Sequence, residues 1–167
     1  MTRIVLIGAP GSGKSTVGHA LAAHLQWPFI DTDQLIEFKA NKKITDIFVV
    51  DGEEIFRAME FETLKEVLQE SSAVISLGGG APISPQAQDE LRKSGSTIIF
   101  LDVSLATAAP RVGFNRDRPL LLGNPRAQWQ ALSDKRRPIY EDLATHAVKV
   151  DDMNVDEIVA VIETMIP

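Results

Sequence analysis

Residues 8–15 constrain the fold of this chain more than any other segment of its sequence. They read Gly-Ala-Pro-Gly-Ser-Gly-Lys-Ser and match the pattern G-x-x-x-x-G-K-[ST], whose glycines let successive backbone N–H groups point at phosphate oxygens. An apolar run at residues 3–7 comes directly before them, and apolar side chains recur at helical spacing over residues 14–25. We therefore expect a strand, a phosphate-binding loop and a helix in this order, with a nucleoside triphosphate as the ligand.

Short apolar runs alternate with longer helical patterns along the rest of the chain. The 167 residues show no repeat and no linker, which indicates a single domain. Strands that alternate with helices form right-handed βαβ units, so the pattern predicts a three-layer α/β fold, a five-stranded parallel sheet with helices on both faces. The expected strands span residues 3–7, 27–31, 73–77, 96–101 and 147–150, and the expected helices span residues 14–25, 33–40, 44–50, 53–70, 84–93, 125–142 and 154–165.

The composition excludes several classes of protein. Hydrophobic residues make up 44% of the chain and charged residues 24%, which is typical of a globular domain. The absence of cysteine excludes disulfides, thiolate zinc sites and a cysteine nucleophile. The net charge of −6 argues against nucleic-acid and anionic-membrane partners, and no apolar run reaches the ~18 residues of a membrane span. We expect a cytoplasmic protein, and a monomer because nothing in the composition demands an oligomer.

Two carboxylates, Asp31 and Asp33, follow the second expected strand. Ligands of a parallel sheet gather at the carboxyl ends of its strands, so we expect both near the phosphate loop. One could bind Mg²⁺ or its water ligands, and the other could accept or orient the proton of an acceptor hydroxyl. The alternative is structural, because Asp33 would also suit the N-cap of the helix that follows. The expected proximity of Lys14 favours the functional interpretation.

Two further strand ends carry candidate residues. Three glycines, residues 78–80, follow the third expected strand and would let the backbone approach a ligand closely, although a plain loop would look the same. Asp102 follows the fourth expected strand, where it could hold Mg²⁺ as a Walker-B aspartate does. An ordinary cap or turn role is more common for such a residue, and it is the interpretation favoured for Asp102.

Arginines cluster in three places. A planar guanidinium binds carboxylate or phosphate through two parallel hydrogen bonds. A single arginine usually lies on a solvated surface, but three clusters in an acidic chain indicate anion binding. The clusters are Arg57 alone, then Arg111, Arg116 and Arg118, and finally Arg136 and Arg137.

The order and spacing of these segments resemble the shikimate kinase family over nearly the whole chain. The similar segments are the phosphate loop at residues 8–15, Asp31-Thr32-Asp33, Phe56-Arg57 with Glu60, Gly78-Gly79-Gly80, Arg118-Pro119-Leu120-Leu121, and Arg136 with Pro138 and Tyr140. The resemblance implies a P-loop fold of the nucleoside-monophosphate-kinase type in one domain, residues 1–167. It also implies a small acceptor-binding insert at about residues 33–61 and a mobile lid at about residues 111–124.

The resemblance further implies the reaction and the roles of single residues. ATP would give its γ-phosphoryl group to the 3-hydroxyl of shikimate in the pathway to aromatic amino acids, with Mg²⁺ as the metal ion. The implied catalytic residues are Lys14, Asp33 and Arg118. The implied nucleotide-binding residues are Gly11, Ser12, Gly13, Lys14, Ser15, Thr16, Arg111 and Arg118, the implied acceptor-binding residues are Asp33, Arg57, Gly79, Gly80 and Arg136, and the implied metal-binding residues are Ser15 and Asp31.

The chain departs from the family pattern in two segments. Residues 38–43 lack the usual glycine, which leaves the start of the insert's second helix undefined. Residues 151–155 lack the arginine and proline often found there, which leaves the second wall of the adenine site undefined.

Two other functions compete with a shikimate kinase. A gluconate kinase would share the phosphate loop but would not combine Arg57, residues 78–80 and Arg136. A nucleotide kinase would also share the loop, but it needs a second binding site for a base, which the sequence does not indicate. A catalytically silent nucleotide-binding regulator would tend to lose one of Lys14, Ser15, Asp33 and Arg118, all of which are present.

Overall fold

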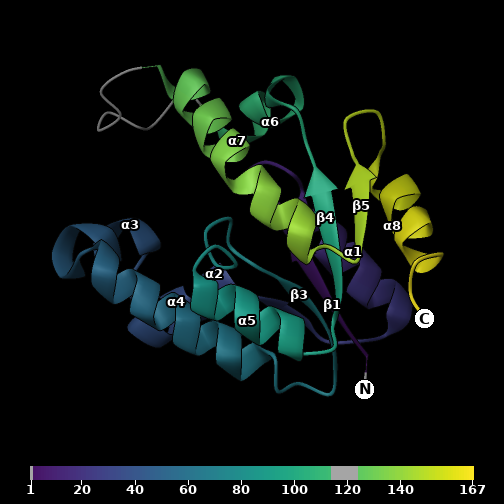
Figure 1. Cartoon of the computed structure of the whole chain (residues 1–167), viewed down its shortest axis with the longest axis horizontal. Coiled ribbons are helices and arrows are strands. Elements are labelled where there is room, and N and C mark those ends of the chain that lie inside the picture. The colour runs from purple at the N-terminus through teal and green to yellow at the C-terminus, as the bar shows by residue number, and fades with distance from the viewer. Residues whose placement is uncertain (1, 114–123) are drawn as a thin grey trace.

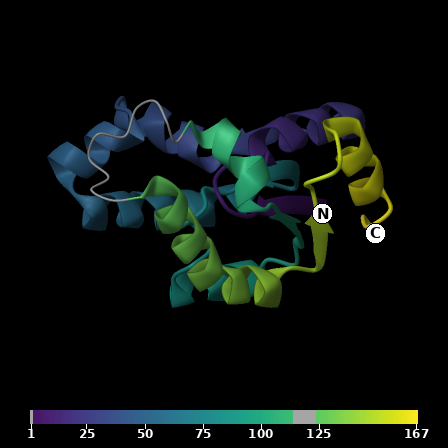
Figure 2. The same cartoon turned by 90° about the horizontal axis from the view of Figure 1, so that it is seen from above.

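The computed structural model describes residues 2–113 and 124–167 and shows a parallel sheet between two layers of helices (Figures 1 and 2). Its strands lie in the order β2-β3-β1-β4-β5, and every neighbouring pair is parallel. The predicted three-layer α/β fold is confirmed. The strands are β1 (Thr2–Ile7), β2 (Phe29–Asp31), β3 (Ser72–Ser76), β4 (Thr97–Asp102) and β5 (His146–Lys149).

The helices follow the predicted pattern, with ends that differ by a few residues. The largest difference lies at residues 44–50, where one expected helix is a single α-helical turn continued by a π-helix that ends at Asp51. The helices are α1 (Lys14–Leu25), α2 (Thr32–Ala40), α3 (Ile44–Asp46), the π-helix η1 (Ile47–Asp51), α4 (Glu53–Val67), α5 (Pro85–Lys93), α6 (Leu105–Val112), α7 (Pro125–Leu143) and α8 (Val155–Glu163). None of these helices is long and apolar enough to cross a membrane.

The sheet is buried on both faces, because successive side chains of a strand point to opposite sides. On β1, Ile4 and Leu6 pack into an apolar cluster with residues of α1 and α8. The alternate residues Val5 and Ile7 pack into a second cluster with residues of α4, α5 and α7. All four side chains are fully buried, which explains why β1 reads as a continuous apolar run.

A third, smaller apolar cluster lies outside the sheet. Ile36 of α2, Ile47 of η1 and Phe56 of α4 form its buried centre, and the ring of Phe48 lies 4.7 Å from that of Phe56. This cluster holds together the helices that leave the carboxyl end of β2 and return to β3, at the left of Figure 1.

Asp102 at the end of β4 binds Arg137 of α7 through both carboxylate oxygens. Nη1 donates to Oδ2 at 3.0 Å and Nη2 donates to Oδ1 at 2.5 Å. The guanidinium also lies over the Phe100 ring, 5.5 Å from the ring centroid. The hydrogen bond to Asp102 raises the pKa of Arg137 above its ordinary value. Asp102 therefore joins the sheet to α7 through an ion pair, a structural role that differs from the cap or turn role expected from the sequence.

We predict that Asp102→Asn lowers the free energy of unfolding by about 1–2 kcal/mol, because it removes the charge from a bidentate, partly buried pair. Urea unfolding followed by circular dichroism measures the change. Asp142→Asn is the matched control, since Asp142 pairs with Arg92 on an exposed surface and should change stability by less than about 0.5 kcal/mol. Equal effects of the two substitutions would contradict a structural role for Asp102.

Candidate active site

The phosphate loop joins β1 to α1 at the carboxyl edge of the sheet. Gly11 and Gly13 have φ angles of 83° and 88°, a backbone conformation that residues other than glycine rarely adopt. Lys14 folds back over the loop, and its Nζ donates to the carbonyls of Gly8 at 2.8 Å and Ala9 at 3.2 Å. The sequence motif thus corresponds to a closed loop with its lysine at the centre.

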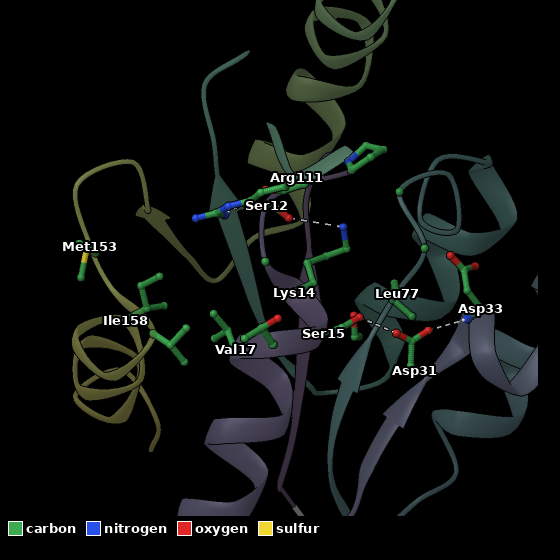
Figure 3. Close-up of a pocket in the computed structure, with 18 of the residues that line it drawn as sticks. Ser12, Lys14, Ser15, Val17, Asp31, Asp33, Leu77, Arg111, Met153 and Ile158 are labelled. Atoms are coloured by element: carbon green, nitrogen blue, oxygen red, sulfur yellow. Dashed lines mark hydrogen bonds between the residues drawn. The ribbon is translucent and has the colours of Figure 1, made fainter. Parts of the chain in front are cut away.

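A cavity of about 650 Å³ lies over this loop (Figure 3). It brings together every predicted nucleotide-binding residue that the structure describes, and the predicted metal-binding pair. Arg118 and residues 114–123 of the expected lid lie outside the described residues. The cavity is lined by Gly11, Ser12, Gly13, Lys14, Ser15, Thr16, Asp31, Asp33, Gly78, Gly79 and Arg111, among others.

The end of the cavity beyond the loop has two different walls. Arg111 of α6 forms one of them, and its Nη1 donates to the Gly11 carbonyl at 3.1 Å. Met153, Val155 and Ile158 contribute to the other from the start of α8 and the turn before it, as Figure 3 shows for Met153 and Ile158. The sequence left this second wall undefined, and the structure supplies apolar side chains there.

Asp31 joins the phosphate-loop helix α1 to α2. Its Oδ1 accepts from the backbone N–H groups of Asp33 at 3.0 Å and Gln34 at 3.1 Å, and its Oδ2 accepts from the Ser15 hydroxyl at 2.6 Å. Asp31 is therefore the N-cap of α2, and the alternative expectation that Asp33 caps this helix is wrong. Asp33 is the second residue of the helix, and both carboxylates still line the cavity.

Asp33 and Lys14 both have pKa values displaced toward neutrality. Burial, followed by the negative charges of Asp31 and Glu60, raises the pKa of Asp33 to about 6, although Lys14 opposes the shift. Burial lowers the pKa of Lys14 to about 8, against the attraction of Asp33 and Asp31. The cleft thus holds a carboxylate and an ammonium that each change charge within two pH units of neutrality.

The glycine turn, residues 78–80, is the point where three of the predicted site side chains converge. A Cβ atom on Gly78 would lie 2.5 Å from Asp33 Oδ1, and one on Gly79 would lie 3.1 Å from Arg136 Nη1. A Cβ on Gly80 would overlap Arg57 Nη1. The three glycines leave the space that these side chains occupy, so a larger residue here would force the end of Asp33, Arg136 or Arg57 to shift.

Arg57 and Arg136 approach the glycine turn from different helices. Arg57 of α4 donates to Glu60 at 2.8 Å, and Arg136 of α7 lines with it a cavity of about 460 Å³ that also includes Gly80. Glu60 is only 5% exposed, and burial raises its pKa while the bond to Arg57 opposes this rise. Two guanidinium groups with one buried carboxylate partner form a site that suits an anionic ligand.

The residues present fit a magnesium ion at one position. Within residues 2–113 and 124–167, no three histidine or acidic side chains gather to form a metal site of their own. The Ser15 hydroxyl and the Asp31 carboxylate nevertheless place two oxygens together at the edge of the nucleotide cavity. Magnesium prefers oxygen ligands and is commonly held by one or two protein groups together with substrate phosphates and water, which this pair allows.

Sequence reasoning named Tyr140 only as part of the segment at Arg136 that resembles the family, did not name Trp129, and gave neither residue a role. Trp129 and Tyr140 of α7 donate hydrogen bonds to the backbone of the phosphate loop and of the glycine turn. The sequence signal for them was limited to their polar aromatic character and their place on a long helix, because buried tyrosine and tryptophan usually bind a partner through O–H or N–H.

Comparisons with known proteins agree on one family. The family model described as shikimate kinase matches residues 10–167. The chain is 47% identical over 163 residues to the shikimate kinase of Thermobifida fusca, covering 98% of this chain and 94% of that protein.

Solved structures give the same result. The shikimate kinase of Acinetobacter baumannii in complex with shikimate has a TM-score of 0.91 at 29% identity, with 98% of this chain and 91% of that chain covered. The shikimate kinase of Aquifex aeolicus has a TM-score of 0.84 at 35% identity, with coverage of 97% and 94%. The chain therefore belongs to the shikimate kinase family, the ATP-dependent kinases that phosphorylate shikimate.

Proposed function

We propose that transfer of the γ-phosphoryl group of ATP to the 3-hydroxyl of shikimate is carried by the side chains that converge on the glycine turn. One observation supports this most strongly: Asp33, Arg57 and Arg136 meet at residues 78–80, beside the cavity that contains Lys14. A base, two anion-binding groups and a phosphate-binding lysine are the parts that phosphorylation of a hydroxy acid needs.

On the nucleotide side, the N–H groups of the phosphate loop and Lys14 bind the phosphates of ATP. Lys14 exchanges its bonds to the Gly8 and Ala9 carbonyls for phosphate oxygens and offsets charge on the transferred group. Ser15 and Asp31 hold Mg²⁺, which neutralises phosphate charge when bound. Arg111 packs against the base, and Arg118, outside the described residues, is proposed as a further catalytic cation on the family resemblance alone.

On the acceptor side, Asp33 accepts the hydrogen bond of the 3-hydroxyl and takes up its proton as the phosphoryl group is transferred. Its raised pKa makes it a better base than an exposed aspartate, and it is still largely ionised at pH 7. Arg57 and Arg136 bind the carboxylate of shikimate, and the N–H groups of Gly79 and Gly80 donate to its polar groups. Placing the hydroxyl in line is the largest part of what these residues contribute.

We also propose the organisation of the chain around this site. Residues 33–61 form the acceptor-binding insert, for which the small cluster of Ile36, Ile47 and Phe56 supplies a separate apolar centre. Residues 111–124 form the lid, and residues 1–167 make one domain. The protein acts as a cytoplasmic monomer on a small molecule, without nucleic-acid or membrane partners, as its acidic composition favours.

The proposed function is tested by asking whether Arg57 and Arg136 bind the carboxylate of shikimate. Arg57→Ala and Arg136→Ala should each raise the KM for shikimate about ten- to a hundredfold, because each loses a charged hydrogen bond, while the KM for ATP changes little. Steady-state ADP release measures both constants, and Arg92→Ala, at an exposed arginine, is the control. If the variants still discriminated shikimate from its uncharged amide as strongly as the native enzyme does, the arginines would not bind the carboxylate.

We predict that Asp33 controls the acidic limb of the pH profile. Ionisation of Asp33 produces the active base, so kcat/KM should rise with pH until it levels off above about pH 6. Asp33→Asn should abolish this limb and lower kcat about 10²- to 10⁴-fold. Asp46→Asn changes an exposed carboxylate of α3 and should retain the native profile. An acidic limb that persists in Asp33→Asn would assign the ionisation to another group.

We predict that Asp31 sets the magnesium requirement. Asp31→Asn keeps an oxygen that can cap α2 but removes the charge, so the Mg²⁺ concentration for half-maximal rate should rise about tenfold or more. Asp33→Asn and Asp102→Asn should leave this concentration nearly unchanged. A magnesium titration of the three variants is the measurement. If Asp33→Asn shifted the requirement and Asp31→Asn did not, the two roles would be reversed.

A further inference from the structure

One helix, α7, donates a partly buried hydrogen bond to each of two loops, the phosphate loop and the glycine turn. Trp129 Nε1 donates to the Pro10 carbonyl in the phosphate loop at 2.9 Å. Tyr140 Oη donates to the Gly79 carbonyl in the glycine turn at 2.6 Å. The two residues are about three turns apart, so they lie on the same face of the helix.

Both aromatic rings are anchored in the protein interior. Tyr140 is 1% exposed, and its ring lies 5.3 Å from that of Phe100 on β4. Trp129 is 7% exposed and packs into the cluster on the other face of the sheet, with residues of α1 and α8. The helix is thus held at both ends by rings in different apolar clusters, and its position relative to the sheet is well defined.

A bond to a backbone carbonyl also orients the N–H group of the next residue. In a trans peptide unit the C=O and the following N–H point in opposite directions within one plane, and the described residues contain no cis peptide bond. Trp129 therefore turns the Gly11 N–H away from α7, and Tyr140 does the same to the Gly80 N–H. Within the described part of the chain, neither N–H donates to another protein group.

We propose that Trp129 and Tyr140 are positioning residues, which orient the Gly11 N–H toward the phosphates and the Gly80 N–H toward the acceptor. The proposal rests on the proposed function, because it needs ATP over the phosphate loop and shikimate at the glycine turn. Helix α7 then sets the distance between the two donors, and Arg136, on the turn before Tyr140, is placed by the same helix.

The environment of Tyr140 supports a donor role. Burial raises the pKa of its hydroxyl, against the opposing charge and hydrogen bond of Arg136, so the group keeps its proton over the working pH range. A protonated hydroxyl can donate to the Gly79 carbonyl while its oxygen lies next to the Arg136 guanidinium. The same residue therefore contacts both the glycine turn and one of the proposed carboxylate-binding arginines.

The test is a pair of substitutions, each expected to weaken the binding of a different ligand. Tyr140→Phe keeps the ring and removes the hydroxyl, so it should weaken shikimate binding about three- to tenfold and change ADP binding less than twofold. Trp129→Phe removes the N–H and should weaken ADP binding by a similar factor while shikimate binding stays nearly unchanged. Calorimetric titration of each ligand gives the dissociation constants, and the matching KM values for ATP and shikimate come from ADP release.

Leu143→Ala is the packing control. Leu143 is a buried residue of α7 in the same apolar cluster as Tyr140, and its side chain has no polar atom. This variant should lower the urea midpoint without changing the ratio of the two dissociation constants. The proposal would be overturned if Tyr140→Phe folded and bound shikimate as tightly as the native protein, or if it weakened the binding of shikimate and ADP equally. It would also be overturned if Leu143→Ala changed the ratio of the two dissociation constants as Tyr140→Phe does. A native protein that released no ADP with shikimate would instead contradict the proposed function, while the dissociation constants would still decide the role of α7.

Discussion

The carboxylate of Asp31 is the interaction on which the arrangement of the site depends. One oxygen accepts the Ser15 hydroxyl at the start of α1, and the other caps α2. This single group therefore links the helix that carries the phosphate loop to the helix that carries Asp33. Because Asp33 lies in the first turn of α2, any shift of Asp31 would move the proposed base as well as the proposed metal ligand.

The charges of Lys14 and Asp33 are not fully compensated before the substrates bind. Burial disfavours the charged forms of Lys14 and Asp33, and each is only partly stabilised by the other. Phosphate binding would add negative charge beside Lys14 and hold it protonated, whereas the arginines on the acceptor side already carry permanent charge. The buried carboxylate of Glu60 pairs with the half-exposed guanidinium of Arg57, so this cation has a fixed partner before an anion arrives. The site is thus preorganised on the acceptor side and adjustable on the nucleotide side.

The sequence predicted those features that depend on local pattern. The phosphate-loop motif and the strand–helix alternation are local; they predicted the fold correctly, and the described residues of the predicted nucleotide site line one cavity. The N-cap of α2 was less certain, because Asp31 and Asp33 are both good caps and the choice depends on where β2 ends. The apolar wall near Met153 and the two bonds from α7 could not be predicted, since they join segments that lie far apart in the chain. Position on a helix does not tell which loop a buried Trp129 or Tyr140 will reach.

The acceptor site illustrates why one fold can serve many kinases. The parallel sheet and the phosphate loop place a nucleotide at the carboxyl edge whatever the acceptor is, so they carry no information about shikimate. In the proposed function, that information lies in side chains from two helices outside the first βα unit, Arg57 of α4 and Arg136 of α7, and in the space that residues 78–80 leave for them. A side chain on any of these glycines would displace a charged group without disturbing the sheet. The proposed acceptor-binding side chains are therefore distinct from those that fill the core, and Tyr140, a core residue that donates to the Gly79 carbonyl, is the link between the two.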